Sequence, residues 1–421
     1  MEAMEKAILV GVNINKEAKF QTSMEELANL TEACGVAVAG ELTQNLPRPT
    51  ASHYIGTGKT EEIKALVELK EANVVIFNDE LSPSQIRNLE ATLECKVIDR
   101  TMLILDIFAV RAKTRESQLQ VEIASLQYML PRLVGLGKSL GRQSGGVGTK
   151  TKGAGETKLE LDKRRIENNI NVLNKELEVL VSQRQTQRKQ RKKSEIPTVS
   201  LVGYTNAGKS TLMNALLESY GQSEGKEVFE KDMLFATLET AVRHLQLPDN
   251  KEFLLTDTVG FVDKLPHHLV KAFRSTLEEV AEADLLLHVI DRSNEDYKEQ
   301  IKVTEKTLKN MGVSDIPMVY VYNKSELAQL DVPFVKDQEV YLSAKNRNGI
   351  DELISLIEKN VFADYVTEEF LIPYNEGQLV SYFNEHAHIL TTEHEEEGTK
   401  LTITCKKADA DKYRNFIVVG H

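Results

Sequence analysis

A phosphate-binding loop is predicted near the middle of the chain. Residues 203–211 read GYTNAGKST, a complete GxxxxGKS pattern that directly follows the strand-like run 198–202. Glycines in this pattern let backbone N–H groups face phosphates, the lysine reaches the β- and γ-phosphates, and the serine is a ligand for Mg2+. We therefore expect a nucleoside triphosphate to bind Gly203, Tyr204, Thr205, Asn206, Ala207, Gly208, Lys209, Ser210 and Thr211.

Two later segments predict contacts to a metal ion and to the terminal phosphate. Asp257-Thr258-Val259-Gly260 follows the apolar run 253–256, where a carboxylate can hold Mg2+ through water and a glycine amide can meet the γ-phosphate. Residues 233–239, MLFATLE, resemble a switch I segment. Its Thr237 would close on Mg2+ and on the γ-phosphate when GTP is bound. We expect Ser210, Thr237 and Asp257 to hold Mg2+, and Lys209, Thr237 and Gly260 to act in hydrolysis.

The base is expected to be guanine, so the nucleotides would be GTP and GDP. Asn323-Lys324-Ser325-Glu326 follows the run 318–322 and resembles the NKxD motif that reads guanine in GTPases. Glu326 keeps the charge that would accept the guanine N1–H and N2 amine, but it is one methylene longer than aspartate. Ser343-Ala344-Lys345 follows the next predicted strand, where GTPases place a loop whose backbone amide contacts guanine O6. This segment therefore indicates the same base.

Hydrolysis by the free chain is expected to be slow. Ras-like proteins have a glutamine that orients the attacking water just after this second phosphate motif, and this chain has Phe261 there. A phenyl ring cannot orient water, so a partner would complete or reshape the site. Asn206 matches an asparagine that some potassium-activated GTPases use to hold K+, although an asparagine suited to a tight turn explains it equally well.

The elements that position these residues form several domains. At 421 residues the chain exceeds the about 250–300 residues at which single cores stop growing. Residues 196–360 alternate strand-like and helical segments, which predicts a doubly wound P-loop GTPase domain. Before it we predict an α/β domain with a parallel sheet and a helical hairpin, and after it a small α+β domain. The predicted boundaries of this α/β multidomain fold are 1–112, 113–193, 194–363 and 364–421.

Short apolar runs predict the strands. In the N-terminal domain they are residues 7–12, 35–39, 74–77 and 96–98, and in the P-loop domain they are 198–202, 253–256, 285–290, 318–322 and 340–342. Residues 54–60, YIGTGKT, lack the first glycine of a phosphate loop because His53 occupies its place. We expect that segment to be a glycine turn that caps a helix.

The hairpin is predicted from two heptad seams, which let two helices close on each other. Both seams have spacings of four, three, four and three residues: Leu119, Ile123, Leu126, Leu130 and Leu133 in the first, and Ile166, Ile170, Leu173, Leu177 and Leu180 in the second. Residues 135–155 between them hold eight glycines and no acidic residue, which predicts a mobile tip.

Positive charge is concentrated in this hairpin. The chain has a net charge of −12, but residues 111–193 contain 19 Lys or Arg against 8 Asp or Glu. A merely solvated helical face would have balanced charge, whereas this excess with an acid-free tip suits an RNA surface. The candidates for contact with rRNA are Lys138, Arg142, Lys150 and Lys152.

Other classes of protein do not fit the sequence. Cys34, Cys95 and Cys405 are scattered without CxxC spacing, which gives neither a disulfide framework nor a zinc site. No run approaches the about 18–20 apolar residues of a membrane span, and the N-terminus lacks the pattern of a secretory leader. We expect a cytoplasmic protein without a membrane span.

Together these motifs resemble the HflX family of ribosome-associated GTPases over about residues 5–415. The resemblance rests on GYTNAGKST, FATLE, DTVGF, NKSE and SAK, preceded by YIGTGKTEEI, TRESQLQVEIASLQYMLPRL and KGAGETKLELDKRRI. It implies a factor that binds the 50S subunit, inserts the hairpin tip towards the peptidyl transferase centre of 23S rRNA, and splits stalled or idle 70S ribosomes. It also implies GTP hydrolysis stimulated by ribosomes. We expect the free factor to be monomeric, and we note that the family usually has aspartate in place of Glu326.

Two alternatives stay open at this point. Glu326 and the basic hairpin also fit an RNA-dependent ATPase that remodels rRNA, which competition between GTP and ATP would distinguish. A GTPase that serves only as a checkpoint in assembly of the 50S subunit would act on precursor particles and would not split mature 70S ribosomes.

Overall fold

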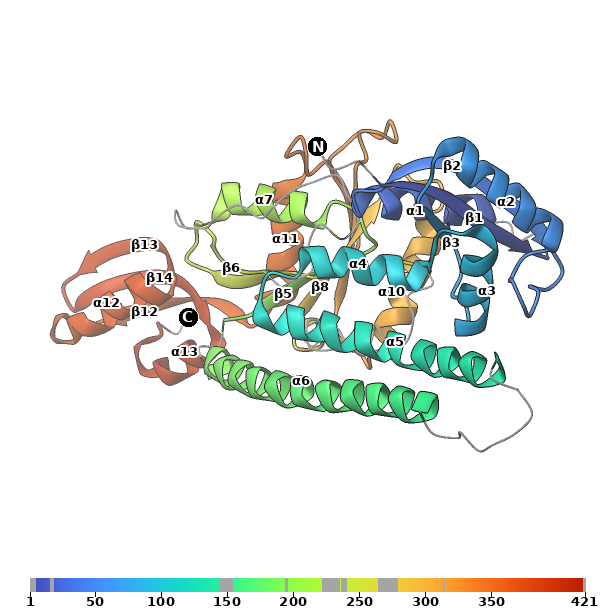
Figure 1. The fold of residues 1–421 in the computed structure, drawn as a ribbon. Coiled ribbons are helices and arrows are strands. Elements are labelled where there is room, and N and C mark those ends of the chain that lie inside the picture. The colour runs from blue at the N-terminus through green and yellow to red at the C-terminus, as the bar shows by residue number, and fades with distance from the viewer. Residues whose placement is uncertain are drawn as a thin grey trace. The chain divides into compact units, whose positions relative to one another are not determined.

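The computed structural model divides into two compact units. It describes residues 5–15, 19–143, 154–193, 196–221, 235, 241–263, 279–313 and 315–418. One unit comprises Met1–Lys189, Lys231–Glu239 and Val262–Ser275, and the other comprises Gln190–Glu230, Thr240–Phe261 and Thr276–His421. The described residues form a four-stranded, a seven-stranded and a three-stranded sheet, so the predicted α/β multidomain fold is confirmed (Figure 1).

The N-terminal sheet is parallel, as predicted, with the strand order β2-β1-β3-β4. The elements of this region are β1 (Lys6–Ile14), α1 (Phe20–Ala33), β2 (Ala37–Leu46), α2 (Thr57–Lys70), β3 (Val74–Phe77), α3 (Pro83–Leu93), β4 (Lys96–Asp99) and α4 (Arg100–Arg111). Strand β3 is buried along its whole length, as the apolar runs of parallel sheets usually are. Strand β2 starts two residues later than predicted, because Gly35 turns the chain with a φ of +82°.

Two helix starts follow from local sequence. Gly56 is the N-cap of α2, so the prediction of a helix-capping glycine turn at 54–60 is confirmed. Helix α3 begins with Pro83 after Ser82, whose hydroxyl accepts from the Gln85 amide while the Gln85 side chain accepts from the Ser82 amide. This capping box satisfies backbone donors that would otherwise have no intrahelical partner.

The predicted helical hairpin is confirmed by α5 (Arg115–Gln143) and α6 (Ala154–Lys193), which run side by side in Figure 1. Eight of the ten predicted seam residues pack together in one cluster: Leu119, Ile123, Leu126, Ile166, Ile170, Leu173, Leu177 and Leu180. The Arg115 guanidinium donates two hydrogen bonds, of 2.7 and 2.9 Å, to the Glu176 carboxylate. A second ion pair joins Arg184 to Glu116 at 3.0 Å. Apolar packing and cross-helix pairs therefore hold the two helices together.

The tip of the hairpin differs from the prediction. A mobile tip was expected over residues 135–155, but α5 continues as a helix to Gln143 and α6 begins at Ala154. Propagating an existing helix costs less than nucleating one, and Leu, Lys and Arg residues favour helix between the glycines. Residues 144–153 lie outside the described part of the chain.

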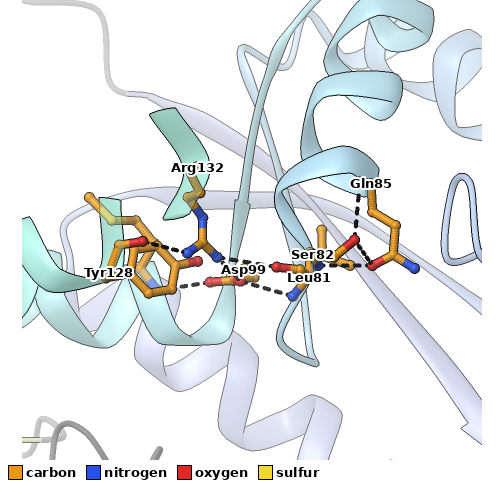
Figure 2. A network of polar contacts seen from close by, with 7 residues as sticks. Leu81, Ser82, Gln85, Asp99, Tyr128 and Arg132 are labelled. Carbon is orange, nitrogen blue, oxygen red and sulfur yellow. Dashed lines mark hydrogen bonds and ion pairs between the residues drawn. The ribbon is translucent and has the colours of Figure 1, made fainter. Parts of the chain in front are cut away.

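A buried polar network anchors α5 to the N-terminal sheet (Figure 2). Asp99, fully buried at the end of β4, accepts from the Leu81 and Met102 amides at 3.0 and 2.9 Å. Its Oδ2 also pairs with the Arg132 guanidinium of α5 at 3.2 Å. Arg132 stacks on the Tyr128 ring, and burial together with the Asp99 carboxylate raises the pKa of Tyr128. One carboxylate thus caps α4 and fixes α5.

The seven-stranded sheet confirms the predicted doubly wound domain. Its elements are β5 (Thr198–Gly203), α7 (Lys209–Tyr220), β6 (Ala241–Gln246), β7 (Glu252–Asp257), β8 (Leu285–Asp291), α10 (Tyr297–Asn310), β9 (Met318–Asn323), β10 (Phe334–Lys336), β11 (Glu339–Tyr341) and α11 (Ile350–Val361). The strand order is β10-β11-β9-β8-β5-β7-β6, and only the edge strands β6 and β10 are antiparallel to their neighbours. Strand β5 lies between β7 and β8, so their carboxyl ends meet at one edge.

A small antiparallel sheet forms the last region. It has the order β12-β14-β13 and packs its apolar face around Phe370 and Phe383. The elements are β12 (Tyr365–Ile372), η1 (Tyr374–Glu376), α12 (Gly377–His386), β13 (His388–Glu395), β14 (Gly398–Lys406), α13 (Lys407–Lys412) and η2 (Arg414–Phe416). Among the residues that the structure describes, no helix has the length and apolar character needed to cross a bilayer.

Candidate nucleotide-binding site

The predicted phosphate loop connects β5 to α7 and depends on two glycines. Gly203 has a φ of +149°, and a Cβ there would collide with the carbonyl oxygen of Val289. Gly208 is the N-cap of α7 with a φ of +91°, and a Cβ there would collide with the Asn323 side chain. Both positions therefore require glycine. The loop leads into the N-terminus of a helix, which is a favourable place for phosphate oxygens.

Lys209 is buried inside this loop. Its Nζ donates to the carbonyl oxygens of Gly203 and Tyr204 at 3.2 and 2.8 Å. Burial lowers the pKa of Lys209 to about 8, and the Asp257 carboxylate offsets part of that shift. A Cβ at Gly260 would lie 2.9 Å from Nζ, so the glycine and the ammonium group are neighbours. Within the part of the chain that the structure describes, the acceptors of the Lys209 ammonium group are backbone carbonyls, which suits a group that takes up phosphate oxygens.

Two of the three predicted Mg2+ ligands lie together. The Ser210 hydroxyl donates to Asp257 Oδ2 at 2.8 Å, and Asp257 is fully buried at the end of β7. A hydroxyl and a carboxylate are hard oxygen donors of the kind that Mg2+ prefers, so these residues fit that ion. The third predicted ligand, Thr237, lies outside the described residues. Asn206 has a φ of +60°, a left-handed conformation that asparagine tolerates in a tight turn.

The segment after Asp257 is bonded to the phosphate loop. The Thr205 amide donates to the Phe261 carbonyl at 2.7 Å, and the Phe261 amide donates to the Gly203 carbonyl at 3.0 Å. Thr258 donates its hydroxyl to the Leu201 carbonyl at 2.6 Å. The Phe261 ring is buried in an apolar cluster with Val202. Phe261 is therefore a packing residue, and its side chain offers no group to orient water.

The guanine motif is joined to the phosphate loop and to the Ser343-Ala344-Lys345 loop. Asn323, which is buried, donates from Nδ2 to the Ala207 carbonyl and accepts from the Ala344 amide, both at 3.0 Å. Lys324 donates from Nζ to the Asn206 carbonyl at 2.8 Å. Residues expected to read the base and residues expected to hold the phosphates therefore belong to one connected framework.

Glu326 is left available for a ligand. Its Oε2 atom is buried and has no hydrogen-bond partner within the described residues. A buried carboxylate oxygen without a donor is costly, and the N1–H and N2 amine of guanine would supply donors. Glu326 thus fits the task predicted for it. Lys345 is exposed, whereas Ser343 and Ala344 are buried.

Two residues of strand β8 were missed in the sequence. Asp291 at its end forms an ion pair with Lys324 at 2.8 Å, and a carboxylate at a strand end next to the nucleotide motifs could have indicated this. His288 is buried in the same strand, where burial and the positive charge of Lys209 lower its pKa to about 3. Nothing in the local pattern of an apolar strand distinguishes this neutral histidine.

Of the four residues predicted to contact rRNA, two lie within the described backbone. Lys138 and Arg142 belong to α5, so they lie on a helix rather than in the predicted loop. The side chains of Lys138 and Arg142 are outside the described part of the structure. Lys150 and Lys152 lie outside it entirely.

Comparison with known proteins identifies close relatives. Family models described as GTP-binding GTPase N-terminal, GTP-binding GTPase Middle Region and 50S ribosome-binding GTPase match residues 21–109, 111–191 and 198–324. The chain is 47% identical over 416 residues to the GTPase HflX of Caldanaerobacter subterraneus subsp. tengcongensis, covering 98% of this chain and 94% of that one. It is 43% identical over 400 residues to the GTPase HflX of Lacrimispora saccharolytica, covering 94% and 92%. A GTP-binding protein from Sulfolobus solfataricus in complex with GDP matches 86% of this chain and 99% of its own, with 24% identity and a TM-score of 0.46.

Proposed function

This chain belongs to the HflX family of GTPases, and we propose that it binds the 50S ribosomal subunit and splits stalled or idle 70S ribosomes. GTP binding and hydrolysis follow from the family. The matching model of 50S ribosome-binding GTPases supports the partner, and the basic hairpin supports 23S rRNA as its contact. We propose that the free factor is a cytoplasmic monomer, and that its domains are 1–112, 113–193, 194–363 and 364–421.

One observation carries the nucleotide part of the proposal. Asn323 and Lys324 bond to the backbone of the phosphate loop, so the base and the phosphates of one nucleotide would be held by a single framework. We propose that Asn323, Lys324, Glu326 and the loop of Ser343, Ala344 and Lys345 bind guanine. Glu326 would accept from the guanine N1–H and N2 amine, which an adenine does not offer in the same places.

We assign the phosphate and metal roles from the same geometry. Residues Gly203 to Thr211 and Asp257 to Gly260 would surround the phosphates, with Lys209 on the β- and γ-oxygens. Ser210, Asp257 and Thr237 would hold Mg2+, which neutralises charge on the phosphate oxygens when bound. Asn206 would be the ligand if K+ also binds. Gly260 would meet the γ-phosphate through its amide, and Lys209 would stabilise the transferring group.

Phe261 explains why the free factor would be slow. Its ring is buried, so no side chain at this position orients the attacking water. We propose that the ribosome supplies or repositions the missing group and thereby stimulates hydrolysis. The GTP state would bind the ribosome, and hydrolysis would release the factor.

The basic hairpin would provide the contact to rRNA. Lys138, Arg142, Lys150 and Lys152 lie in the segment where glycines and basic residues occur without acids. Such a segment suits insertion among phosphates, with order gained on binding. Replacing these four residues by Glu should weaken binding to 50S subunits, while replacing the exposed Lys175 on α6 by Glu tests charge removal outside the tip.

The decisive experiment measures GTP turnover with and without 50S subunits or 70S ribosomes, together with sedimentation of the ribosomes. We expect a large ribosome-dependent rise that is specific to GTP, and conversion of 70S particles to subunits. A rise with ATP instead would favour a remodelling ATPase. Stimulation by precursor particles, without splitting of 70S ribosomes, would favour an assembly factor.

A further inference from the structure

The Lys324 side chain connects the phosphate loop to a carboxylate at the end of β8. Its ammonium group donates to the Asn206 carbonyl and to Asp291 Oδ2, both at 2.8 Å. Asp291 is the register partner of Asn323 on the neighbouring parallel strand β9, so Lys324 leaves that strand directly beside it. All four residues belong to one compact unit and to the described part of the chain.

The two residues at the ends of the Lys324–Asn206 bond both have an unusual backbone. The φ of Lys324 is +57° and that of Asn206 is +60°. Asparagine enters this left-handed region more readily than lysine does, and a lysine stays there only where its surroundings impose it. The side chain of Lys324 is 24% exposed and that of Asp291 is 17% exposed, so the ion pair is partly shielded from water. The geometry of Lys324 is therefore fixed by defined contacts.

The two carboxylate oxygens of Asp291 have different partners. Oδ1 accepts from the Ser293 amide at 3.0 Å and from the Ser293 hydroxyl at 2.6 Å, which closes a turn directly after β8. Oδ2 accepts from Lys324. One oxygen thus shapes its own loop, and the other reaches across to the guanine motif. Because the roles are divided between two atoms, substitutions can separate them.

The ion pair with Asp291 orders Lys324 in the absence of a nucleotide. A lysine side chain has many rotamers, and a ligand that needs one of them must bear the cost of losing the others. A side chain that is already held by Asn206 and Asp291 avoids that cost. Removing one partner of a shielded charge pair acts mainly on the rate of dissociation. The carboxylate of Asp291 should therefore affect how long a nucleotide stays bound.

We propose that Asp291 is a positioning residue for the nucleotide, which acts through Lys324 to keep the phosphate loop and the guanine motif connected and thereby slows the release of GDP. This rests on the guanine site proposed above, to which Lys324 belongs. The competing explanation is that the ion pair only stabilises the turn after β8. It predicts a lower melting temperature without faster release of nucleotide.

Asp291→Asn separates the two roles of the carboxylate. The amide keeps an oxygen for Ser293 but loses the negative charge that attracts Lys324. Dissociation of a fluorescent GDP, measured by stopped flow in excess GDP, should become about tenfold faster, while association changes little. Asp291→Glu keeps the charge, so its release rate should lie closer to that of the wild type. A wild-type release rate in Asp291→Asn would overturn the proposal.

Ser293→Ala is the matched control, because it removes the hydroxyl bond to Oδ1 and leaves the ion pair with Lys324 in place. Its release rate should equal that of the wild type. If Ser293→Ala and Asp291→Asn lowered the melting temperature of the nucleotide-free protein equally and sped release equally, the role of the carboxylate would be structural and the proposal would be wrong.

A double-mutant cycle tests whether Asp291 acts through Lys324. Lys324→Met removes the ammonium group and should itself speed the release of GDP. Adding Asp291→Asn should then have no further effect, since both substitutions break one interaction. An undiminished effect of Asp291→Asn in the methionine background would reject the inference.

These rates separate the inference from the proposed function, because they are measured on the full chain without ribosomes. If Glu326→Ala left the preference for GTP unchanged, or if ribosomes were neither split nor stimulatory, the corresponding part of the proposed function would fail. The release rates of Asp291→Asn, Ser293→Ala and the double variant would still decide the role of Asp291.

Discussion

The hydroxyl of Ser210 and the carboxylate of Asp257 share a 2.8 Å hydrogen bond, although 47 residues separate them in the chain. The bond joins the first residues of α7 to the end of β7, two neighbouring places at the carboxyl edge of the sheet. Both side chains would hold Mg2+ when it binds, the carboxylate through water. Ser210→Ala or Asp257→Asn should therefore weaken Mg2+-dependent GTP binding by at least about tenfold.

Titration of GTP binding with and without Mg2+ measures that effect. Ser219→Ala is the matched control, since Ser219 is exposed on the same helix. If both serine variants lost affinity equally, or if the loss persisted without Mg2+, the metal assignment would have to be abandoned.

Nucleotide affinity should fall as the pH rises above about 8. Burial lowers the pKa of Lys209 to about 8, so the ammonium form predominates below that pH and is lost above it. Phosphate oxygens favour the charged form, which raises the pKa in the complex and couples binding to proton uptake. GDP affinity should decrease by up to about tenfold per pH unit between about 8 and 10.

Isothermal titration at several pH values, in buffers of different ionisation enthalpy, measures this proton uptake. Lys209→Arg keeps its positive charge throughout this pH range. If this variant still binds GDP, its affinity should not change with pH. A wild-type profile as flat as that of the arginine variant would contradict the prediction.

Glu326 should determine the choice of base. Removing its carboxylate in Glu326→Ala leaves the guanine N1–H and N2 amine without acceptors, so GTP affinity should fall about 10- to 100-fold while ATP affinity changes little. Glu326→Asp should retain the preference for GTP, because aspartate keeps a carboxylate at this position and is the residue of the usual family motif. Competition of GTP and ATP for a fluorescent nucleotide measures both. A selectivity unchanged in the alanine variant would show that another group reads the base.

His288 should make stability depend on pH. Burial lowers its pKa to about 3 from an ordinary value of 6.5, so below pH 6.5 the unfolded chain takes up a proton that the folded chain does not. The free energy of unfolding should therefore fall by up to about 1.4 kcal/mol for each pH unit between about 6.5 and 3. At higher pH, His288 is neutral in both states and has no such effect.

Urea unfolding of the nucleotide-free protein at pH 7, 6 and 5 tests this slope. His288→Gln removes the titrating group, so the difference between the wild type and the variant isolates it from the carboxylates. A difference that stays constant across these pH values would show that His288 is not held neutral.

Most of the nucleotide site could be predicted because its residues are dictated locally. Gly203 and Gly208 must be glycine to avoid collisions, and Asn323 must be an amide that both donates and accepts. The buried strands were predictable for the same reason, since their apolar runs are continuous. By contrast, β6, β10 and β13 were missed, because edge strands such as Ala241–Gln246 need only one apolar face and carry polar residues.

The remaining errors involve relationships across the chain or context along a helix. The pairing of Asp291 with Lys324 and the docking of Phe235 on Phe108 depend on how distant segments meet, which no local pattern encodes. Helix α5 extends further than predicted, because a helix already formed over about twenty residues continues through glycines that would not start one.

The length of α6 has a mechanical consequence. Its forty residues, Ala154–Lys193, extend about 60 Å at the rise of an α-helix. Such a rod behaves as a lever, so a rotation of only about 5° at its carboxyl end would carry its amino end through about 5 Å, the size of one helical turn. Over this length, a small angular change at Lys193 would displace Ala154 by a distance comparable with the spacing of nucleotides.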